Sequence, residues 1–98
     1  MSTGDEPGRL ADRIATAVAS CPSVARLAEG PIATYLPGRA VRGVAVREDE
    51  VRIAVVARYG LPLARVADQV RAAAGHEAPG RRVDVTIADI ETRDVEAR

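Results

Sequence analysis

The sequence of 98 residues contains no Lys, Asn, Phe or Trp, and its only aromatic residues are Tyr35 and Tyr59. Without large aromatic rings, a core must be built from aliphatic side chains, of which Val, Ile and Leu supply 23. This content is above the level typical of disordered chains. The length suits one domain rather than two.

Lysine is absent, so arginine supplies all 14 basic charges, which 14 acidic residues balance. The chain as a whole therefore has no net attraction to nucleic acid or to anionic lipid. The exclusive use of Arg indicates a GC-rich coding bias. The alternative is selection of Arg for bidentate contacts with carboxylate or phosphate groups.

A single cysteine, Cys21, cannot form an internal disulfide, which excludes a secreted disulfide-stabilised scaffold. No stretch approaches the ~18 apolar residues of a membrane span, and the acidic N-terminus does not resemble a signal peptide. We therefore expect a cytoplasmic protein that reaches a membrane only at its surface or through a partner. Cys21 ends an apolar stripe with no His or Lys nearby in sequence, so we interpret it as a small packed hydrophobe.

In the first half, residues 1–8 are expected to be a flexible N-terminus, followed by a helix over residues 9–20. Its apolar residues recur at helical spacing: Leu10, Ile14, Ala17, Val18 and Cys21. Residues 24–27 are a short edge strand, and residues 28–39 are rich in Gly and Pro and are expected to be a loop. Within it, Ile32, Tyr35 and Leu36 either anchor the loop to the core or form an exposed patch for a partner.

The second half predicts a strand, a helix and a strand. Strands over residues 41–47 and 51–58 are joined by the acidic turn 48–50. Tyr59 and Gly60 end the second strand, Pro62 opens a helix, and Gly75 is its expected C-cap. A last strand covers residues 83–88, and residues 91–98 form a charged tail. The residues expected on the buried face of this helix are Leu63, Val66, Ala67, Val70 and Ala74, with a surface pair between Arg65 and Asp68.

These elements predict an α/β (α+β) fold in a single small domain over residues 9–90. Its order is αββαβ-like, with a small mixed sheet and two helices packed on one face. The strands 51–58 and 83–88 are expected to be parallel because a helix joins them. Val51, Ile53 and Val55 face the core, while Val56 breaks the polar pattern of the opposite face.

Catalytic and metal-binding patterns are missing. One His76 and one Cys21 fall short of the four ligands of a structural zinc site, and no phosphate-binding glycine loop or serine-nucleophile motif occurs. His76 is interpreted as a solvated loop residue. We expect no enzyme activity, no cofactor and no metal.

The order of residues from Gly43 to Ile90 resembles the alkaline shock protein family of envelope stress response proteins. The resemblance rests on the strands 43–46 and 51–56, the Tyr59-Gly60 break, the Pro62-led Val-Ala-Asp-Gln-Val helix and the alternating strand 83–90. It covers roughly residues 9–90 and implies a bacterial α/β protein without catalytic residues. It also implies a cytoplasmic location near the inner face of the membrane through a membrane-anchored partner. Departures include Ser23, where Gly is usual, and an acidic turn without Gly.

The resulting hypothesis is a non-enzymatic envelope stress response or scaffold protein that acts through protein–protein contacts, with a homo-oligomer as one form. The expected contact residues are Tyr35, Leu36, Val56, Arg58 and Tyr59, because aromatic and Arg side chains carry much interface energy; ordinary core packing is the alternative for each, above all for Tyr59. A second hypothesis is a small nucleic-acid-binding module with Arg42, Arg47, Arg52 and Arg58 on one sheet face. A third is a small-ligand regulatory domain.

Overall fold

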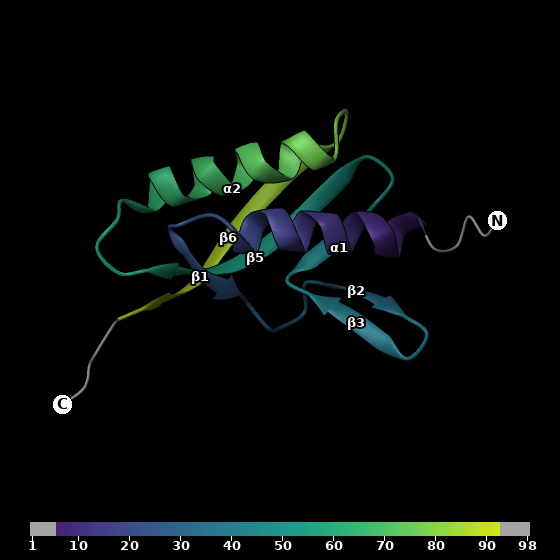
Figure 1. Cartoon of the computed structure of the whole chain (residues 1–98), viewed down its shortest axis with the longest axis horizontal. Coiled ribbons are helices and arrows are strands. Elements are labelled where there is room, and N and C mark those ends of the chain that lie inside the picture. The colour runs from purple at the N-terminus through teal and green to yellow at the C-terminus, as the bar shows by residue number, and fades with distance from the viewer. Residues whose placement is uncertain (1–5, 93–98) are drawn as a thin grey trace.

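The central strand β5 (Glu50–Arg58) pairs with every other strand of the main sheet in the computed structural model, which describes residues 6–92. β6 (Arg82–Glu91) runs parallel along one edge of β5. β4 (Val44–Val46) and β1 (Val24–Leu27) run antiparallel along the other edge, beside the first and second halves of β5 respectively. The result is a narrow mixed sheet (Figure 1).

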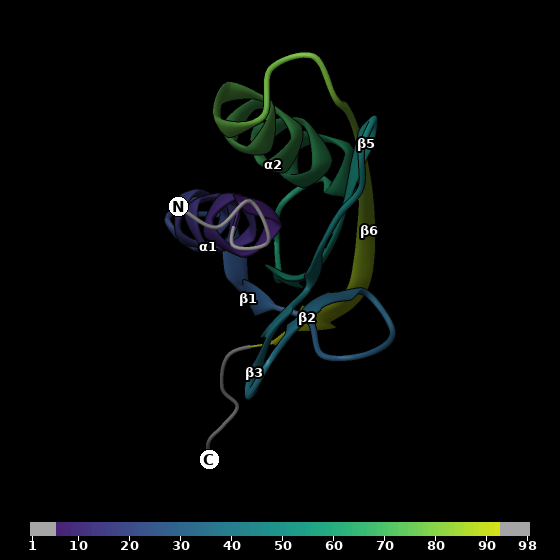
Figure 2. The same ribbon diagram turned by 90° about the vertical axis from the view of Figure 1, so that its right-hand side faces the viewer.

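Two helices, α1 (Glu6–Ala19) and α2 (Leu63–Glu77), cover the same face of this sheet (Figure 2). α2 joins the parallel strands β5 and β6, as the strand–helix–strand pattern predicts. The predicted class, with two helices on one small mixed sheet, is confirmed. The core between helices and sheet is aliphatic and includes Ile14, Val18, Ile53, Val55, Val66 and Val70, all at 0% exposure.

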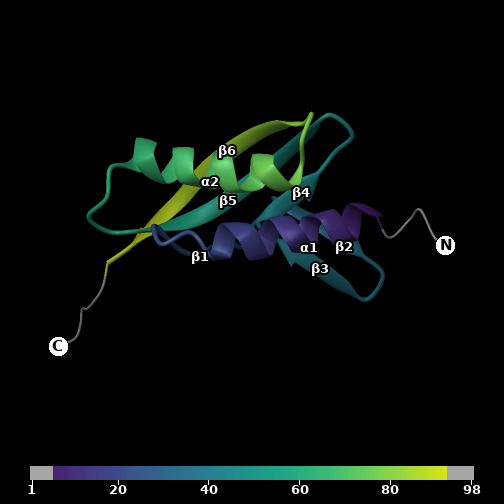
Figure 3. The same ribbon diagram turned by 45° about the horizontal axis from the view of Figure 1, so that its top comes forward.

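A β-hairpin occupies most of the segment expected to be a loop. β2 (Ala33–Leu36) and β3 (Arg39–Arg42) form a separate antiparallel sheet, which lies beside α1 (Figure 3). The tight turn at Pro37-Gly38 allows the pairing, because Gly38 adopts a φ of 80° that other residues resist. The loop expected over residues 28–39 and the single strand over 41–47 were therefore wrong.

The chain leaves the main sheet for the hairpin and returns to it opposite the same residue of β5, Ala54. The Ala28 N–H donates to the Ala54 carbonyl (2.8 Å), and the Ala54 N–H donates to the Gly43 carbonyl (2.9 Å). β1 and β4 are thus two parts of one interrupted edge strand, with residues 29–42 as an excursion between them. Gly43, at a φ of 86°, turns the chain back into the sheet.

Helix α1 begins three residues earlier than its apolar pattern predicts. Glu6 places negative charge in the first turn, and Pro7 sits where a helix tolerates a missing N–H. Gly8 is buried against Leu36, where a Cβ would lie 2.8 Å from the leucine Cδ1. The expected flexible N-terminus of residues 1–8 was therefore wrong for residues 6–8, and residues 1–5 lie outside the described part of the chain.

Helix α2 and strand β6 both extend past their predicted ends. Gly75 lies inside α2, which continues to Glu77 and brings Ala78 into the core at 1% exposure. His76 is exposed in the last helical turn rather than in a loop. Glu91 still pairs with Arg58 in β6, so the charged tail begins later than expected, and residues 93–98 lie outside the described part.

A second, smaller apolar cluster lies on the sheet face away from the helices. Ala28, Ala54 and Val56 are buried there, with Ala25 and Ile32 packed against them. The segment from β1 to β2 passes over this face (Figure 2). Val56 is only 5% exposed, so its interpretation as a partner contact was wrong.

Cys21 packs at the border of the main core, as the apolar stripe predicts. Burial raises the pKa of its thiol, which keeps it protonated at neutral pH. Next to it, the Ser23 hydroxyl is 1% exposed and donates to Gln69 Oε1 at 2.6 Å. This bond satisfies a buried polar group and ties the start of β1 to α2.

Glu50, at the start of β5, joins two strands through its carboxylate. Arg82 of β6 donates to Oε1 (2.6 Å), and Arg52 lies 3.3 Å from Oε2. The hydrogen bond from Arg82 and the charge of both guanidinium groups hold the pKa of Glu50 below its usual range. A lowered carboxyl pKa stabilises the fold above the unfolded pKa, and this contribution is lost as the pH falls through the folded value.

Glu50→Gln is therefore expected to lower the urea midpoint at neutral pH. The difference in midpoint between the variant and the unsubstituted protein should be constant above the usual carboxyl pKa, 4.5. It should shrink below that pH and vanish in strong acid. Urea titrations from pH 2 to 7 measure it. Glu48→Gln is the control. This substitution removes the same charge, but Glu48 has no ion pair among residues 6–92. An equal effect of both substitutions at every pH would contradict the role of the Glu50 pair.

Candidate interaction surface

Four of the five large hydrophobic side chains that are exposed in the described chain gather at one end of the molecule. Tyr59 is 72% exposed, and Leu61, Leu63 and Ile90 are 40%, 43% and 41% exposed. With Arg58 and Glu91 beside them, we call these six residues the Tyr59 corner. Contiguous exposed apolar groups of this kind mark interaction surfaces more often than scattered ones do.

The Tyr59 corner forms because the parallel strands β5 and β6 end together. Ala57 is in register with Ile90, and Arg58 with Glu91. The Tyr59 N–H then donates to the Glu91 carbonyl at 3.0 Å, which fixes the tyrosine beyond the last strand pair. Gly60, at a φ of 100°, turns the chain towards α2.

Leu61 and Leu63 of the corner flank the turn into α2. Pro62 has an extended backbone, with φ −60° and ψ 132°, and starts the helix. Leu63 was expected on the buried face, but it lies in the first helical turn at 43% exposure. Burial of the helix begins one turn later, at Val66.

A cavity of about 470 Å³ opens at the Tyr59 corner and is lined by Arg58, Tyr59, Leu61 and Glu91. Arg58 Nε donates to the Pro22 carbonyl at 3.0 Å, which anchors that side chain to the start of β1. Glu91 Oε1 lies 3.2 Å from Arg26 Nη1, in an exposed ion pair. The lining offers apolar contact area with charged groups at its border, an arrangement suited to binding a polypeptide.

Of the five predicted contact residues, the structure brings Arg58 and Tyr59 together. The interpretation of Tyr59 as a core residue was wrong, because the chain turns away from the sheet at Gly60. Sequence reasoning missed Leu61, Leu63 and Ile90 as contact residues. The signal for the leucines was the Tyr-Gly-Leu-Pro-Leu run, since apolar residues on both sides of a tight turn cannot all reach one core.

The other predicted pair, Tyr35 and Leu36, lies on β2, away from the Tyr59 corner. Leu36 packs against the core, as expected of an anchor. Tyr35 is 72% exposed and is not an anchor, because neighbouring residues of a strand point to opposite faces. Its register partner on β3 is Ala40.

The four arginines expected on one sheet face are separated. Arg42 belongs to β3 and Arg47 follows β4, so neither shares a strand with the other two. Arg52 and Arg58 are six residues apart on β5, roughly 20 Å along a strand. Arg52 is also paired with Glu50 at 3.3 Å. A continuous basic sheet face is therefore absent from the described residues, and this prediction was wrong.

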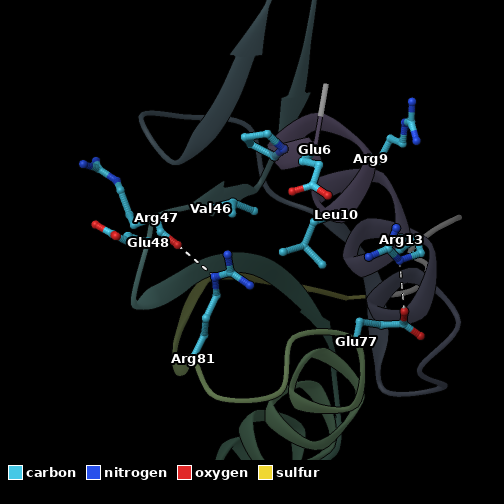
Figure 4. Close-up of a pocket in the computed structure, with 10 residues that line it drawn as sticks. Glu6, Arg9, Leu10, Arg13, Val46, Arg47, Glu48, Glu77 and Arg81 are labelled. Atoms are coloured by element: carbon cyan, nitrogen blue, oxygen red, sulfur yellow. Dashed lines mark hydrogen bonds and ion pairs between the residues drawn. The ribbon is translucent and has the colours of Figure 1, made fainter. Parts of the chain in front are cut away.

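A groove of about 470 Å³ lies at the opposite end of the molecule, between α1, the β4–β5 turn and the end of α2 (Figure 4). Leu10 and Val46 lie near its centre. Arg13 Nε is 3.5 Å from Glu77 Oε1, and Arg81 Nε donates to the Arg47 carbonyl at 3.0 Å. Two of its guanidinium groups therefore already have protein partners, and the lining mixes both signs of charge. The Tyr59 corner is the stronger candidate.

Within residues 6–92, no three His, Cys, Asp or Glu side chains are placed to hold a metal ion. In the same residues, neither helix has the length and apolar character needed to cross a membrane.

Comparison with protein-family models, curated proteins and solved structures found no match to this chain.

Proposed function

We propose that the protein is a non-enzymatic scaffold of the envelope stress response, similar to the alkaline shock proteins, and that it acts through protein–protein contacts. One observation carries the proposal: four exposed large hydrophobic side chains gather at the Tyr59 corner. Burying such side chains against a partner stabilises a complex by roughly 25 cal/mol per Å² of apolar area, before the entropic cost of association is subtracted.

The location we propose is cytoplasmic, at the inner face of the membrane through a small membrane-anchored protein. The resemblance supports this location through the strand–Tyr–Gly–Pro–helix order of residues 51–70, and that segment builds the Tyr59 corner. The same residues thus carry the resemblance and the exposed apolar side chains. The nucleic-acid alternative lacks comparable support, because its arginines lie on separate segments.

Site-specific photo-crosslinking in the protein's native cells tests this proposal. A photoreactive amino acid at Leu61 is expected to capture one small protein, recovered from the membrane fraction. The same amino acid at Ala72, which is exposed on α2 outside the corner, is the matched control and should not capture it.

Three results would contradict the proposal. Equal capture from Leu61 and Ala72 would mean that the Tyr59 corner is not a specific surface. Capture of ribosomal proteins from the soluble fraction, lost after nuclease, would favour the nucleic-acid alternative. Substrate turnover by the purified protein, abolished by one side-chain change, would contradict a non-enzymatic role.

A further inference from the structure

Two carboxylates lie near the Tyr59 corner, and one of them, Glu91, already has an arginine partner. Glu91 accepts the ion pair from Arg26 at 3.2 Å. Asp89 Oδ1 accepts the Ile90 N–H at 2.8 Å, and Asp89 is in register with Val56, which packs on the sheet face away from the helices. Glu91 therefore adds no unopposed negative charge to the corner, whereas Asp89, on the same sheet face as Arg58, is the one carboxylate there without an ion pair in the described chain.

The positive groups there are not neutralised. Among residues 6–92, the Arg58 side chain has no ion pair, and its one hydrogen bond goes to a backbone carbonyl. The predicted pair of Arg65 with Asp68 was wrong: Asp68 pairs with Arg71 at 3.2 Å, which leaves Arg65 without an ion pair in the described chain. Arg58 of the corner and Arg65, which follows Leu63 in the first turn of α2, are thus both without a carboxylate partner in the described chain.

The start of α2 adds to this positive character. Its first turn contains no acidic residue, and Pro62 provides no side-chain cap. The unpaired N–H groups of a helix N-terminus carry partial positive charge. At the Tyr59 corner the positive groups without a carboxylate partner, Arg58, Arg65 and the helix N-terminus, thus outnumber the one unpaired carboxylate, Asp89.

We propose that the Tyr59 corner binds a partner segment that presents apolar side chains flanked by carboxylates; this rests on the proposed function of the corner as a protein-binding surface. The apolar side chains would cover Tyr59, Leu61 and Leu63, and the carboxylates would pair with Arg58 and Arg65. Arg–carboxylate pairs are bidentate and directional, so they fix the orientation of a segment that apolar contact alone leaves undefined.

The same charges disfavour a second copy of this chain as the occupant. In a two-fold symmetric dimer the same patch meets itself. Two Tyr59 corners would bring Arg58 and Arg65 of both copies together, with Glu91 already engaged by Arg26 in each. Like charges brought together at an interface oppose association.

NMR titration of the ¹⁵N-labelled full chain with two synthetic peptides tests the proposal. Both peptides carry Leu at the same positions, and one has Glu where the other has Lys. The Glu peptide is expected to shift the amides of residues 58–61, 63–65 and 90–92 and to bind at least about 10-fold more tightly at low salt, since one charge-assisted bond contributes about that factor. Added salt should reduce the difference.

Charge reversal provides the matched control. Arg58→Glu with Arg65→Glu is expected to invert the preference, so that the Lys peptide binds more tightly. Arg42→Glu makes the same type of change on the exposed hairpin and should leave the preference for the Glu peptide intact. Both variants are checked for an unchanged amide spectrum away from the substitutions.

Equal binding of the two peptides, amide shifts outside the Tyr59 corner, or no binding would overturn the acidic-partner proposal. Concentration-dependent shifts of the corner amides without peptide would identify a second copy as the occupant instead. If Leu61 crosslinks a membrane partner but the Glu peptide has no advantage, the proposed function stands and only the acidic chemistry is wrong. If the Glu peptide binds while crosslinking finds no membrane partner, the envelope role is wrong.

Discussion

Gly43→Ala is expected to destabilise the fold by roughly 3 kcal/mol or more, from left-handed strain of about 1–2 kcal/mol and steric overlap of similar size. An added Cβ would lie 2.8 Å from Leu27 Cβ and 3.0 Å from the Ala54 carbonyl oxygen. Two of its three close neighbours are backbone oxygens of the main sheet, which cannot rotate away. Urea unfolding followed by circular dichroism measures the loss.

Gly38→Ala separates strain from overlap. Gly38 has a φ of 80°, close to the 86° of Gly43, but no atom lies within 4 Å of its added Cβ. The expected cost at Gly38 is therefore only the strain of about 1–2 kcal/mol. If both substitutions lower the free energy of unfolding equally, steric overlap at Gly43 adds nothing to the strain. The close approach of Gly43 to β5 would then not limit stability, which would contradict this prediction.

Val56→Asp is expected to destabilise the protein by about 3 kcal/mol or more, because a carboxylate would be buried without a partner. Val56 is 5% exposed and packs with Ala28 and Ala54 beneath the segment that leads into the hairpin. Since small domains have total stabilities of about 5–15 kcal/mol, this variant should be largely unfolded in mild urea. Chemical denaturation at pH 7 provides the measurement.

Leu61→Asp makes the same chemical change at the Tyr59 corner. Leu61 is 40% exposed, so its expected effect on stability is within about 0.5 kcal/mol. Capture of the partner should nevertheless be lost, because an apolar contact is replaced by a carboxylate that repels an acidic segment. We assign Val56 to the packed interior and Leu61 to the interaction surface. A stable Val56→Asp protein with impaired partner capture would contradict this assignment.

The sequence predicts the strand–helix–strand half of the fold well because its signals are local. Val51, Ile53 and Val55 alternate along β5, and Pro62 fits the first turn of a helix. The hairpin escaped prediction because it depends on contacts between distant residues. Leu36 packs against Gly8, and the Gly43 carbonyl accepts a hydrogen bond from the Ala54 N–H. Neither contact produces a periodic pattern in the sequence.

The candidate site could be predicted only in part, since exposure depends on where neighbouring elements end. Tyr59 continues the alternation of buried residues along β5, so pattern alone places it in the core. Ile90 is out of step with the half-buried residues 83, 85 and 87 of β6, because the β5–β6 register shifts after Ile87. Both are exposed at the end of the sheet, where β5 and β6 stop together, a relation that no window of sequence contains. Val56 shows the reverse: it alternates with core residues, yet the segment 28–32 covers it.

The interrupted edge strand has a consequence for comparing this chain with others. Both ends of the excursion are fixed at Ala54, so the sheet register on either side does not depend on how many residues lie between Ala28 and Gly43. The part beyond Leu36 and Arg39 points away from the sheet and can lengthen or shorten without moving β1 or β4. Homologous chains are therefore expected to differ in length here, and an alignment that forbids a gap in this segment will misplace one of the two half-strands.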